Sequence, residues 1–406
     1  MNTLNPAHQA PKEGLIIGVQ KPIFWLGIVS FLTDISSEMI FSVLTIFLTV
    51  ILGASSVILG LMEGIADFSA SSLDYISGYF SDKTGKRKAF AIFGYGFSTL
   101  AKCILVINNS IYAVVTFRIV ERLGKSIRGA PRDALISSIT DKTRLGYSFG
   151  FHKAMDKTGA VLGPFIAYLL LTFLGQTMAT FQLIFWIAIV PALASVIVMA
   201  IFIKEKPVTK KEHVERKFFS VYGLLGKEFK QYIKIAGIFS LGYFSLAFLL
   251  FKAYQAGFQI KDVTLLYGIF NLSFILISIP MGKLGDKIGR EKIIMIEYLL
   301  YILICIGFIF VNNQIGIIVL FLLYGIFYAI DEGQTKAYIS SITPEEHRGS
   351  ALGIYNFITG LIYLAASLIA GFLWNTFSPN AMFMFAACTT LIALILFYIH
   401  TKRKHA

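Results

Sequence analysis

Gly78-Tyr-Phe-Ser-Asp82-Lys-Thr-Gly85-Lys86 stands directly after one long apolar run of this sequence, and Gly282-Lys-Leu-Gly-Asp286-Lys-Ile-Gly289-Arg290 stands after another, 204 residues further on. A second repeat, Ile-Ser-Ser-Ile-Thr, occupies residues 136–140 and again 339–343, at an offset of 203. Two matches at nearly the same offset indicate that one structural unit occurs twice in the chain. Glycines after an apolar run favour a tight turn, and the Asp can cap a neighbouring helix or pair with a cation.

The composition around these repeats is that of a membrane protein. The 406 residues are 56% hydrophobic and 15% charged, whereas an ordinary soluble domain is about 45–50% apolar and about 25% charged. Such a chain cannot bury its apolar surface in one or two soluble cores, so we expect an all-α protein that crosses the bilayer many times. A soluble enzyme, a disulfide scaffold and a disordered chain are excluded.

Apolar runs separated by Gly, Asn and charge clusters predict twelve membrane-spanning helices, six in each copy of the repeat. The expected spans are 23–51, 56–80, 89–107, 111–133, 147–174, 179–203, 232–257, 262–282, 293–311, 315–340, 350–376 and 380–400. Several carry charges, which are costly in lipid, so these spans should lie inside a bundle. The expected division is an N-terminal segment 1–22, a six-helix bundle 23–203, a linker 204–231, a second bundle 232–400 and a tail 401–406.

Positive charge is distributed unevenly between the two sets of loops. Lys and Arg cluster after the second and eighth spans, in the linker and in the tail, whereas the opposite loops hold only Lys261 as a cation. Because cytoplasmic loops carry the excess of Lys and Arg, we expect both termini in the cytoplasm and the protein in a bacterial inner membrane. This distribution explains the formal net charge of +13 without nucleic acid. The expected partners are lipid, a small-molecule substrate and protons, and the expected state is a monomer.

The Gly-x-x-x-Asp-x-x-Gly-Lys/Arg pattern after the second helix of each half resembles the signature loop of the major facilitator superfamily. The resemblance covers essentially the whole chain and implies two pseudo-symmetric six-helix bundles, related as parallel repeats, with a site between them near the midplane. Charged residues that lie toward the cytoplasmic side also predict a gate there, for which membrane anchoring and helix capping are the alternative. The gate and loop residues are Asp74, Gly78, Asp82, Gly85, Arg87, Arg132, Asp133, Asp156, Gly282, Asp286, Gly289 and Arg290.

The fifth expected span refines this resemblance. Its glycine motif consists of Gly150, Gly159, Gly163 and Pro164. The motif is similar to the helix-5 motif of antiporters and exporters in the superfamily, although Ala167 and Tyr168 replace its closing glycines. The resemblance therefore favours export. Close packing of these glycines against a neighbouring helix is the alternative interpretation.

The fourth expected span reads Arg118-x-x-Glu121-Arg122-x-Gly124, which resembles the superfamily's helix-4 motif built on a buried Arg. An Arg replaces the first glycine of that motif, so the correspondence extends to Arg118 alone. Through residues 34–39, 131–135 and 150–156 the chain also resembles a bacterial permease and efflux subgroup, which implies no particular substrate.

Charged residues inside spans mark candidate sites for a proton or a substrate. Asp34 and Glu38 share one face of the first span, and Arg118 falls within about one helical turn of them in depth at 1.5 Å per residue. We therefore expect proton binding by these acids to weaken their pairing with Arg118; static pairing is the alternative. By resemblance, helices 1, 4, 7 and 10 line the cavity. The residues expected there are Asp34, Glu38, Arg118, Glu121, Arg122, Asp331 and Thr335.

The leading hypothesis is a proton-coupled secondary transporter that exports small organic molecules by alternating access. Import of a nutrient or a metal chelate such as a siderophore stays open, because the basic stripe of the fourth span suits an anionic ligand. A non-transporting sensor is a third class, but the loops are too short for a signalling domain. Without a phosphate-binding loop, a nucleophile elbow or zinc spacing, we predict no enzyme, cofactor or metal site. Residues within spans that receive no role are Lys102, His152, Lys252 and Glu297.

Overall fold

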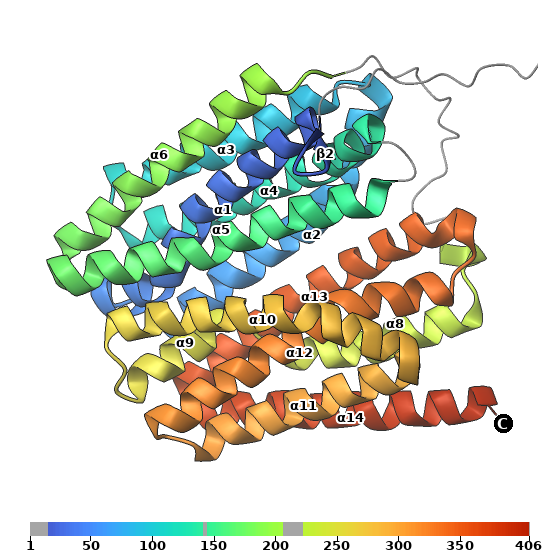
Figure 1. Cartoon of the computed structure of the whole chain (residues 1–406). Helices are drawn as coiled ribbons and strands as arrows, with labels where there is room; N and C mark the ends of the chain where they lie inside the picture. Colours follow the sequence, from blue (N-terminus) through green and yellow to red (C-terminus); the bar gives the residue numbers. More distant parts are fainter. Residues whose placement is uncertain (1–14, 141–143, 206–221, 406) are drawn as a thin grey trace, which may run out of the picture.

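The computed structural model describes residues 15–140, 144–205 and 222–405 (Figure 1). The N-terminal half holds β1 (Leu15–Ile16), β2 (Val19–Gln20), α1 (Lys21–Ile46), the π-helix η1 (Phe47–Ile51), α2 (Ser56–Thr84), α3 (Arg87–Ile107), α4 (Ile111–Ile139), α5 (Leu145–Leu174) and α6 (Met178–Phe202). The C-terminal half holds α8 (Lys227–Gly242), α9 (Leu246–Gln255), α10 (Ile260–Ile288), α11 (Arg290–Phe310), α12 (Gln314–Ser341), the 3-10 helix η3 (Glu345–His347), α13 (Arg348–Thr376) and α14 (Pro379–His405).

The helices form two bundles that lie side by side. In Figure 1, α1–α6 lie together in the upper part and α8–α14 in the lower part. Within the described residues, ten helical stretches are long and apolar enough to cross a membrane, with α8 and α9 forming one of them. α2 and α4 are each 29 residues long but more polar, and they pack against each other and against neighbouring helices. This arrangement is consistent with twelve spans, and the chain is a multi-pass membrane protein.

The ends of several helices are fixed by short polar side chains, as expected for Ser, Thr and Asn at N-caps. Ser110 Oγ accepts from the backbone N–H of Ala113 at 3.2 Å before α4, and Asn313 Oδ1 accepts from Gly316 at 2.7 Å before α12. Ser55 and Thr177 act in the same way at α2 and α6. These loop residues therefore end one span and begin the next within a few positions.

The seventh expected span, 232–257, is not one helix. α8 begins at Lys227, ends at Gly242, and is followed by an extended segment before α9 begins at Leu246. Hydropathy does not detect this break, because the residues around it are as apolar as the helices they separate. Other helices run past the predicted ends: α4 reaches Ile139 and α10 reaches Ile288, because a helix continues into water after its apolar stretch ends.

The two signature loops make equivalent contacts in the two bundles. Arg87 Nη1 donates to the carbonyl oxygen of Ala134 in α4, and Arg290 Nη1 donates to that of Ala337 in α12. Donor and acceptor are 47 residues apart in both cases. This repeated hydrogen bond is direct structural support for the duplicated unit inferred from the sequence.

The same loops explain why the sequence repeats have two different offsets. Two residues, Gly85 and Lys86, connect α2 to α3, whereas Gly289 alone connects α10 to α11. Matching residues before the loop are therefore 204 positions apart, and matching residues after it are 203 positions apart. Gly85 (φ +69°) and Gly289 (φ +96°) both adopt positive φ, which a side chain disfavours and glycine accepts.

The two bundles contact each other along α2 with α13 and along α5 with α10. At the first contact, a Cβ atom on Gly60 would lie 2.2 Å from the carbonyl oxygen of Ser367, and one on Gly371 would lie 2.5 Å from that of Ser56. Ser56 Oγ also donates to the Gly371 carbonyl oxygen at 3.1 Å. Glycine is therefore required on both helices for the backbones to approach this closely.

Within the N-terminal bundle, α5 packs closely on α1 through two glycines of the helix-5 motif. A Cβ atom on Gly159 would lie 2.4 Å from the carbonyl oxygen of Phe31, and one on Gly163 would lie 2.7 Å from that of Ile35. Gly150 has open space around it. Close packing thus accounts for Gly159 and Gly163, and it places them next to the segment of α1 that carries Asp34 and Glu38.

Because Gly159 and Gly163 are closely packed and Gly150 has open space around it, we predict opposite effects of alanine at these positions. Gly159→Ala and Gly163→Ala should each destabilise the protein by about 1–3 kcal/mol, because a backbone oxygen leaves no room for the methyl group. Gly150→Ala is the matched control and should be neutral or stabilise by up to about 1 kcal/mol through helix propensity. Thermal unfolding of the purified variants in detergent measures all three. Equal melting temperatures for the three variants would contradict the packing argument.

Candidate functional site

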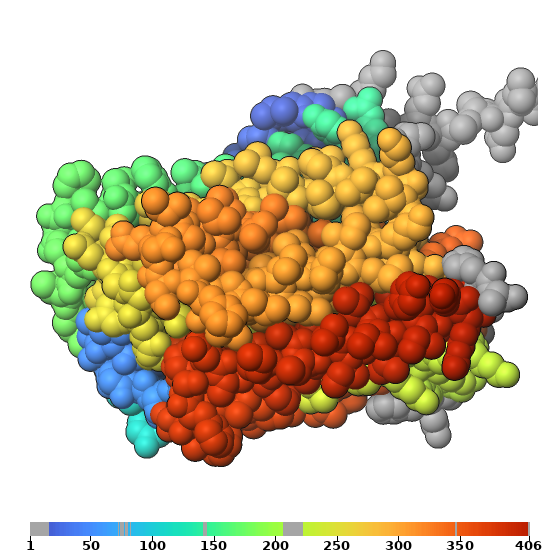
Figure 2. All heavy atoms as spheres, turned by 90° about the horizontal axis from the view of Figure 1, so that it is seen from below, coloured from blue at the N-terminus to red at the C-terminus, as the bar shows by residue number. Residues whose placement is uncertain are grey.

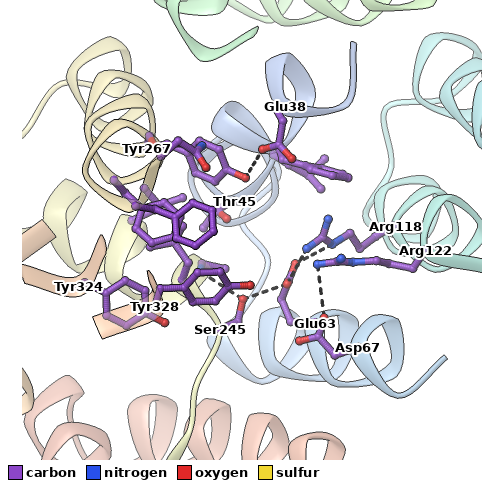
Figure 3. Close-up of a pocket in the computed structure, with 18 of the residues that line it drawn as sticks. Glu38, Thr45, Glu63, Asp67, Arg118, Arg122, Ser245, Tyr267, Tyr324 and Tyr328 are labelled. Carbon is purple, nitrogen blue, oxygen red and sulfur yellow. Dashed lines mark hydrogen bonds and ion pairs between the residues drawn. The ribbon is translucent and has the colours of Figure 1, made fainter. Parts of the chain in front are cut away.

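Three adjacent hollows lie between the two bundles, and we call them chambers 1, 2 and 3. Chamber 1 has a volume of about 200 Å³ and is lined by both bundles, including α1, α2, α4 and α5 on one side and α10 and α12 on the other (Figure 3). Chamber 2, of about 420 Å³, lies among α1, α4, α5, α10 and α12, and chamber 3, of about 240 Å³, among α2, α12 and α13. Tyr328 borders all three chambers, and together they form the central cavity.

The strongest contact in the cavity joins Arg118 of α4 to Glu63 of α2. Arg118 Nε and Nη2 donate to the two carboxylate oxygens at 3.0 and 2.8 Å (Figure 3). Both side chains are nearly buried, at 7% and 3% exposed, and the guanidinium carbon lies 4.3 Å from the centre of the Phe41 ring. A bidentate, buried pair of this kind holds two helices in a fixed relation.

This geometry corrects the predicted pairing of helix 4 with helix 1. Arg118 does not bind Asp34 or Glu38, since two of its nitrogens are taken by Glu63 and the third, Nη1, has no hydrogen-bond partner among the described residues. One turn further along, Arg122 Nη2 lies 3.4 Å from Asp67 Oδ1. Two acids four residues apart on α2 therefore face two arginines four residues apart on α4.

Glu38 has a different kind of partner. Its carboxylate accepts a hydrogen bond from the hydroxyl of Tyr267 on α10 in the opposite bundle (Figure 3). In the described part of the chain it has no ion-pair partner within bonding distance. It lines both chamber 1 and chamber 2. Glu38 is thus a cavity carboxylate whose charge is not neutralised by a bound arginine or lysine.

Asp34 lies one turn from Glu38 and lines chamber 2. Lys125 of α4 and Lys157 of α5 line the same chamber. Neither lysine has a hydrogen bond or ion pair in the described ranges; the Lys157 ammonium lies 4.1 Å from the centre of the Phe274 ring. Chambers 1 and 2 therefore present carboxylates and ammonium groups that are near one another but not bonded.

The break between α8 and α9 supplies a second hydroxyl to the N-terminal bundle. Ser245, in the extended segment, donates to Glu63 Oε2 at 2.9 Å (Figure 3). The break is itself held by Tyr301 of α11, whose hydroxyl donates to the Gly242 carbonyl oxygen at 3.0 Å and accepts from the Phe244 N–H at 3.4 Å. One phenol therefore satisfies two backbone groups that a continuous helix would have paired.

Tyr301→Phe should destabilise the protein by about 1–3 kcal/mol, because two buried backbone groups lose the hydroxyl that pairs with them. Tyr298→Phe is a matched control on the same helix: the Tyr298 hydroxyl makes no hydrogen bond to the described residues, and its ring stacks on Phe239 at 4.5 Å. Thermal unfolding in detergent compares the two variants. A Tyr301→Phe variant that melts with the Tyr298→Phe control would show that the hydroxyl does not hold the break.

Several residues predicted for the gate lie around chamber 2. Arg132 and Asp133 form an ion pair at 2.9 Å, and Ser30 donates to Asp156 Oδ1 at 2.7 Å. Lys153 of α5 reaches Glu332 of α12 at 3.4 Å and so bridges the two bundles. The side chains of three further predicted residues fall outside the described part of the structure: Asp74, Gly78 and Asp82. On the second signature loop, Asp286 lies 3.8 Å from Arg290 and Gly282 has open space around it.

The C-terminal bundle contributes a second group of acids. Asp331 and Thr335, two of the residues predicted for the cavity, line chamber 3. Glu297 of α11 is fully buried, and neither oxygen of its carboxylate has a hydrogen-bond partner among the described residues. Glu121, in contrast, borders none of the three chambers and is buried beside α3, where Ser98 donates to its backbone oxygen.

The remaining unassigned residues differ in their surroundings. Lys102 is fully buried and donates to Ser37 on α1 at 3.2 Å. His152 is 4% exposed, and its Nε2 atom has no hydrogen-bond partner in the described parts of the chain. Lys252 is half-buried near the end of α9. None of the three borders the central cavity.

Some residues that line the cavity are not among those predicted for it from the sequence. Glu63 and Asp67 carry the same four-residue spacing as Asp34 and Glu38, which was the available signal. Ser245 and the aromatic residues of the C-terminal bundle carry no such signal. The aromatic side chains that line chamber 1 are Phe41, Tyr243, Tyr267, Phe270, Phe274, Tyr324 and Tyr328. Within the described residues, no group of three His, Cys, Asp or Glu side chains is arranged to hold a metal ion.

Comparison with known proteins agrees with this architecture. The sequence profile of the Major Facilitator Superfamily matches residues 26–330 and 265–406. An uncharacterized MFS-type transporter of Methanocaldococcus jannaschii, MJ1317, is 38% identical over 389 residues, which cover 94% of this chain and 95% of that protein. The Mycobacterium tuberculosis protein Rv2265 is 24% identical over 381 residues, covering 92% and 91%.

Solved structures share the fold at low sequence identity. The nucleoside transporter NupG superposes with a TM-score of 0.75 at 12% identity, and the match covers 94% of this chain and 99% of that one. The POT family transporter PepTSo gives 0.77 at 12% identity, with 94% and 98% covered. With a profile match over most of the chain and a relative at 38% identity, the chain belongs to the major facilitator superfamily and is a secondary transporter, not an enzyme.

Proposed function

We propose that this transporter couples the export of a small organic molecule to the movement of protons, by alternating access to the central cavity. The observation that carries the proposal is Glu38, a carboxylate between the bundles that accepts a hydrogen bond from a hydroxyl of α10 and has no ion-pair partner in the described residues. A carboxylate without a cation loses less by taking up a proton than one that is held by an arginine. Glu63, bonded to Arg118 in the same chamber, is the contrasting case.

The contacts around Glu38 link its charge to the arrangement of the bundles. Tyr267 belongs to the C-terminal bundle and donates to a carboxylate of the N-terminal bundle. A hydrogen bond to an ionised acceptor is about twice as strong as a neutral one. Protonation of Glu38 would therefore weaken a contact between the bundles and favour their separation on that side of the cavity. Asp34, one turn away in chamber 2, is the second candidate for this role.

The lining of chambers 1 and 2 favours a small polar molecule with a planar part. Lys125 and Lys157 are free to contact an acidic group, Glu38 and Asp34 a basic group, and Tyr328 and its aromatic neighbours a flat ring. Structural relatives that transport nucleosides or peptides are named for ligands in this range of size. The direction of transport rests on the helix-5 motif, whose Gly159 and Gly163 also serve packing.

Uptake of an anionic molecule, including a metal chelate, is the second candidate. It is favoured by one observation: Lys125 and Lys157 border both chambers and have no ion-pair partner within the described ranges. Two such ammonium groups in a cavity attract an organic anion. A flux experiment with imposed pH gradients distinguishes export from uptake.

The test is flux into proteoliposomes that contain the purified protein, with a panel of nucleosides, amino acids, peptides, organic anions and amphiphilic cations. Each compound is measured with the lumen acidic, with the lumen alkaline and without a gradient. Proton-coupled export predicts that a compound accumulates in the lumen when the lumen is acidic, since protons leave as the substrate enters. Accumulation with an alkaline lumen would show symport instead, and flux that ignores both gradients would refute proton coupling.

We further propose that both termini and the linker lie in the cytoplasm of a bacterial cell and that the protein acts as a monomer. The β1–β2 hairpin and the C-terminal end of α14 lie at the same end of the molecule, on the right in Figure 1, as an even number of spans requires. In a variant without the native cysteines, single cysteines at positions 109, 177 and 313 should react with an impermeant reagent from outside. Cysteines at 85 and 213 should react only after permeabilisation; the reverse pattern would contradict this orientation.

A further inference from the structure

A groove of about 680 Å³ lies on the outer face of the C-terminal bundle, away from the central cavity. It runs between the first turns of α8 and the last turns of α14, which pack against each other. Figure 2 shows α14 (red) across the face in view, with residues of α8 (yellow-green) beside its C-terminal end. Inside the bundle, the buried rings of Tyr232 of α8 and Phe397 of α14 pack against each other, with their centres 5.9 Å apart.

The groove is formed by one face of each helix. On α8, Lys227, Gln231, Lys234 and Ile238 follow each other at intervals of three or four residues, which places them on one stripe. On α14 the corresponding stripe runs from Leu396 to Arg403. The order is therefore reversed between the two helices: the stripe on α8 begins with a basic residue and ends with an apolar one, whereas the stripe on α14 begins with an apolar residue and ends with a basic one.

The outer face of α14 at this place is turned toward lipid. Leu396 and Ile399 are 38% and 40% exposed, and Ile392 and Ile395, on the adjoining surface, are about half exposed. Exposed apolar side chains in such number belong against hydrocarbon in a membrane protein. From Lys227 to Ile238 the groove extends about 16 Å at 1.5 Å per residue, close to half of the hydrocarbon thickness of about 30 Å.

The polar end of the groove carries an excess of positive charge. Lys404 is held by Glu228 and Glu291, so its charge is compensated by the protein. Lys227, Lys234 and Arg403 have no ion pair or hydrogen bond with the described residues. Glu228, the carboxylate among the described residues that line the groove, is bonded to Lys404. Three unpaired cations beside apolar side chains complement an anionic head group attached to acyl chains.

We propose that this groove binds an anionic membrane phospholipid, with the phosphodiester at Lys227, Lys234 and Arg403 and an acyl chain along Ile238 and Leu396. The lysine at position 234 lies between the two ends of the groove and can extend its ammonium group toward the phosphate while its methylene chain covers apolar surface. The bound lipid spans α8 and α14, the first and last helices of the C-terminal bundle. It therefore links the two helices from outside, independently of the substrate that occupies the cavity.

The proposal is tested by native mass spectrometry of the full chain in detergent. The probe is an equal mixture of dioleoyl phosphatidylglycerol and dioleoyl phosphatidylcholine, which differ in head-group charge and not in acyl chains. The wild-type protein should retain the phosphatidylglycerol preferentially. The Lys227→Gln/Lys234→Gln/Arg403→Gln variant should lose at least about tenfold of that affinity, since each cation near a membrane surface contributes roughly fivefold.

Two further variants separate the groove from general surface charge. Lys204→Gln/Lys292→Gln/Lys402→Gln removes the same charge from exposed positions that do not line the groove, and it should bind as the wild type does. Leu396→Trp keeps every cation but fills the apolar end, and it should also lose phosphatidylglycerol. Glycerol phosphate, which is a head group without chains, should not displace the lipid at equal concentration.

Each of four results would overturn the proposal. The first is that the wild type retains the two lipids equally, which would also be seen if another part of the chain filled the groove. The second and third are that the triple groove variant or Leu396→Trp binds phosphatidylglycerol as the wild type does. The fourth is that glycerol phosphate displaces the lipid. Circular-dichroism melting of every variant establishes that lost binding is not lost folding.

Discussion

Replacing Glu38 by glutamine is expected to abolish accumulation driven by a proton gradient while substrate counterflow continues. Glutamine has nearly the size of glutamate and still accepts the hydrogen bond from Tyr267 through its amide oxygen, but it takes up no proton. Counterflow exchanges labelled for unlabelled substrate without net proton movement, so it needs the cavity and the movement of the bundles only. The comparison therefore isolates coupling from binding.

Two variants extend this experiment. Tyr267→Phe removes the contact between the bundles and keeps the carboxylate, so it should slow exchange and retain dependence on the proton gradient. Asp34→Asn/Glu38→Gln removes both acids of α1 and should leave no gradient-driven transport. If this double variant still accumulates substrate against its gradient when a pH difference is imposed, the acids of α1 are not the coupling site.

The largest effect on stability is expected at Arg118. Arg118→Met leaves the Glu63 carboxylate buried, with the hydroxyl of Ser245 as its one remaining hydrogen-bond partner among the described residues. An uncompensated buried charge costs about 3–5 kcal/mol. Arg118→Met/Glu63→Met removes both charges together and should recover most of the lost stability, because a buried ion pair and a packed apolar pair are often similar in free energy. Thermal unfolding in detergent compares the stability of the wild type, the single variant and the double variant.

The neighbouring pair provides the matched control. Arg122 and Asp67 lie at 3.4 Å, with side chains 23% and 31% exposed, so water can solvate either partner when the other is removed. Arg122→Met should cost no more than about 1 kcal/mol. A loss for Arg118→Met as small as for Arg122→Met, or a double variant no more stable than Arg118→Met alone, would show that the buried pair does not hold α2 against α4.

The fold was predictable because its signals are local in the sequence. The apolar runs and the repeated loops at Gly85 and Gly289 each act within a few residues. Even the one-residue difference between the two repeat offsets has a local cause in the loop length. What hydropathy missed was the break at residues 243–245, because the hydrogen bonds that stabilise it come from Tyr301, far away in the sequence.

The pairing of charges in the cavity was not predictable in the same way. Depth along the membrane predicted Arg118 near Glu38, and both residues line chamber 1. Which acid an arginine reaches also depends on the rotation of each helix, and one residue turns the helix by about 100°. Spacing alone therefore did not distinguish Glu38 from Glu63, and the same reasoning placed Glu121 in a cavity that its side chain does not reach.

The central claim, that proton movement accompanies substrate movement through Glu38, is tested most directly by measuring lumenal pH in proteoliposomes during transport. A pH-sensitive dye is enclosed, and a substrate found in the flux panel is added outside without any imposed pH difference. With the wild-type protein the lumenal pH should rise as substrate enters, because protons leave in exchange, and with Glu38→Gln substrate should enter with no change of pH. Entry of substrate through the wild-type protein at constant lumenal pH would contradict the account.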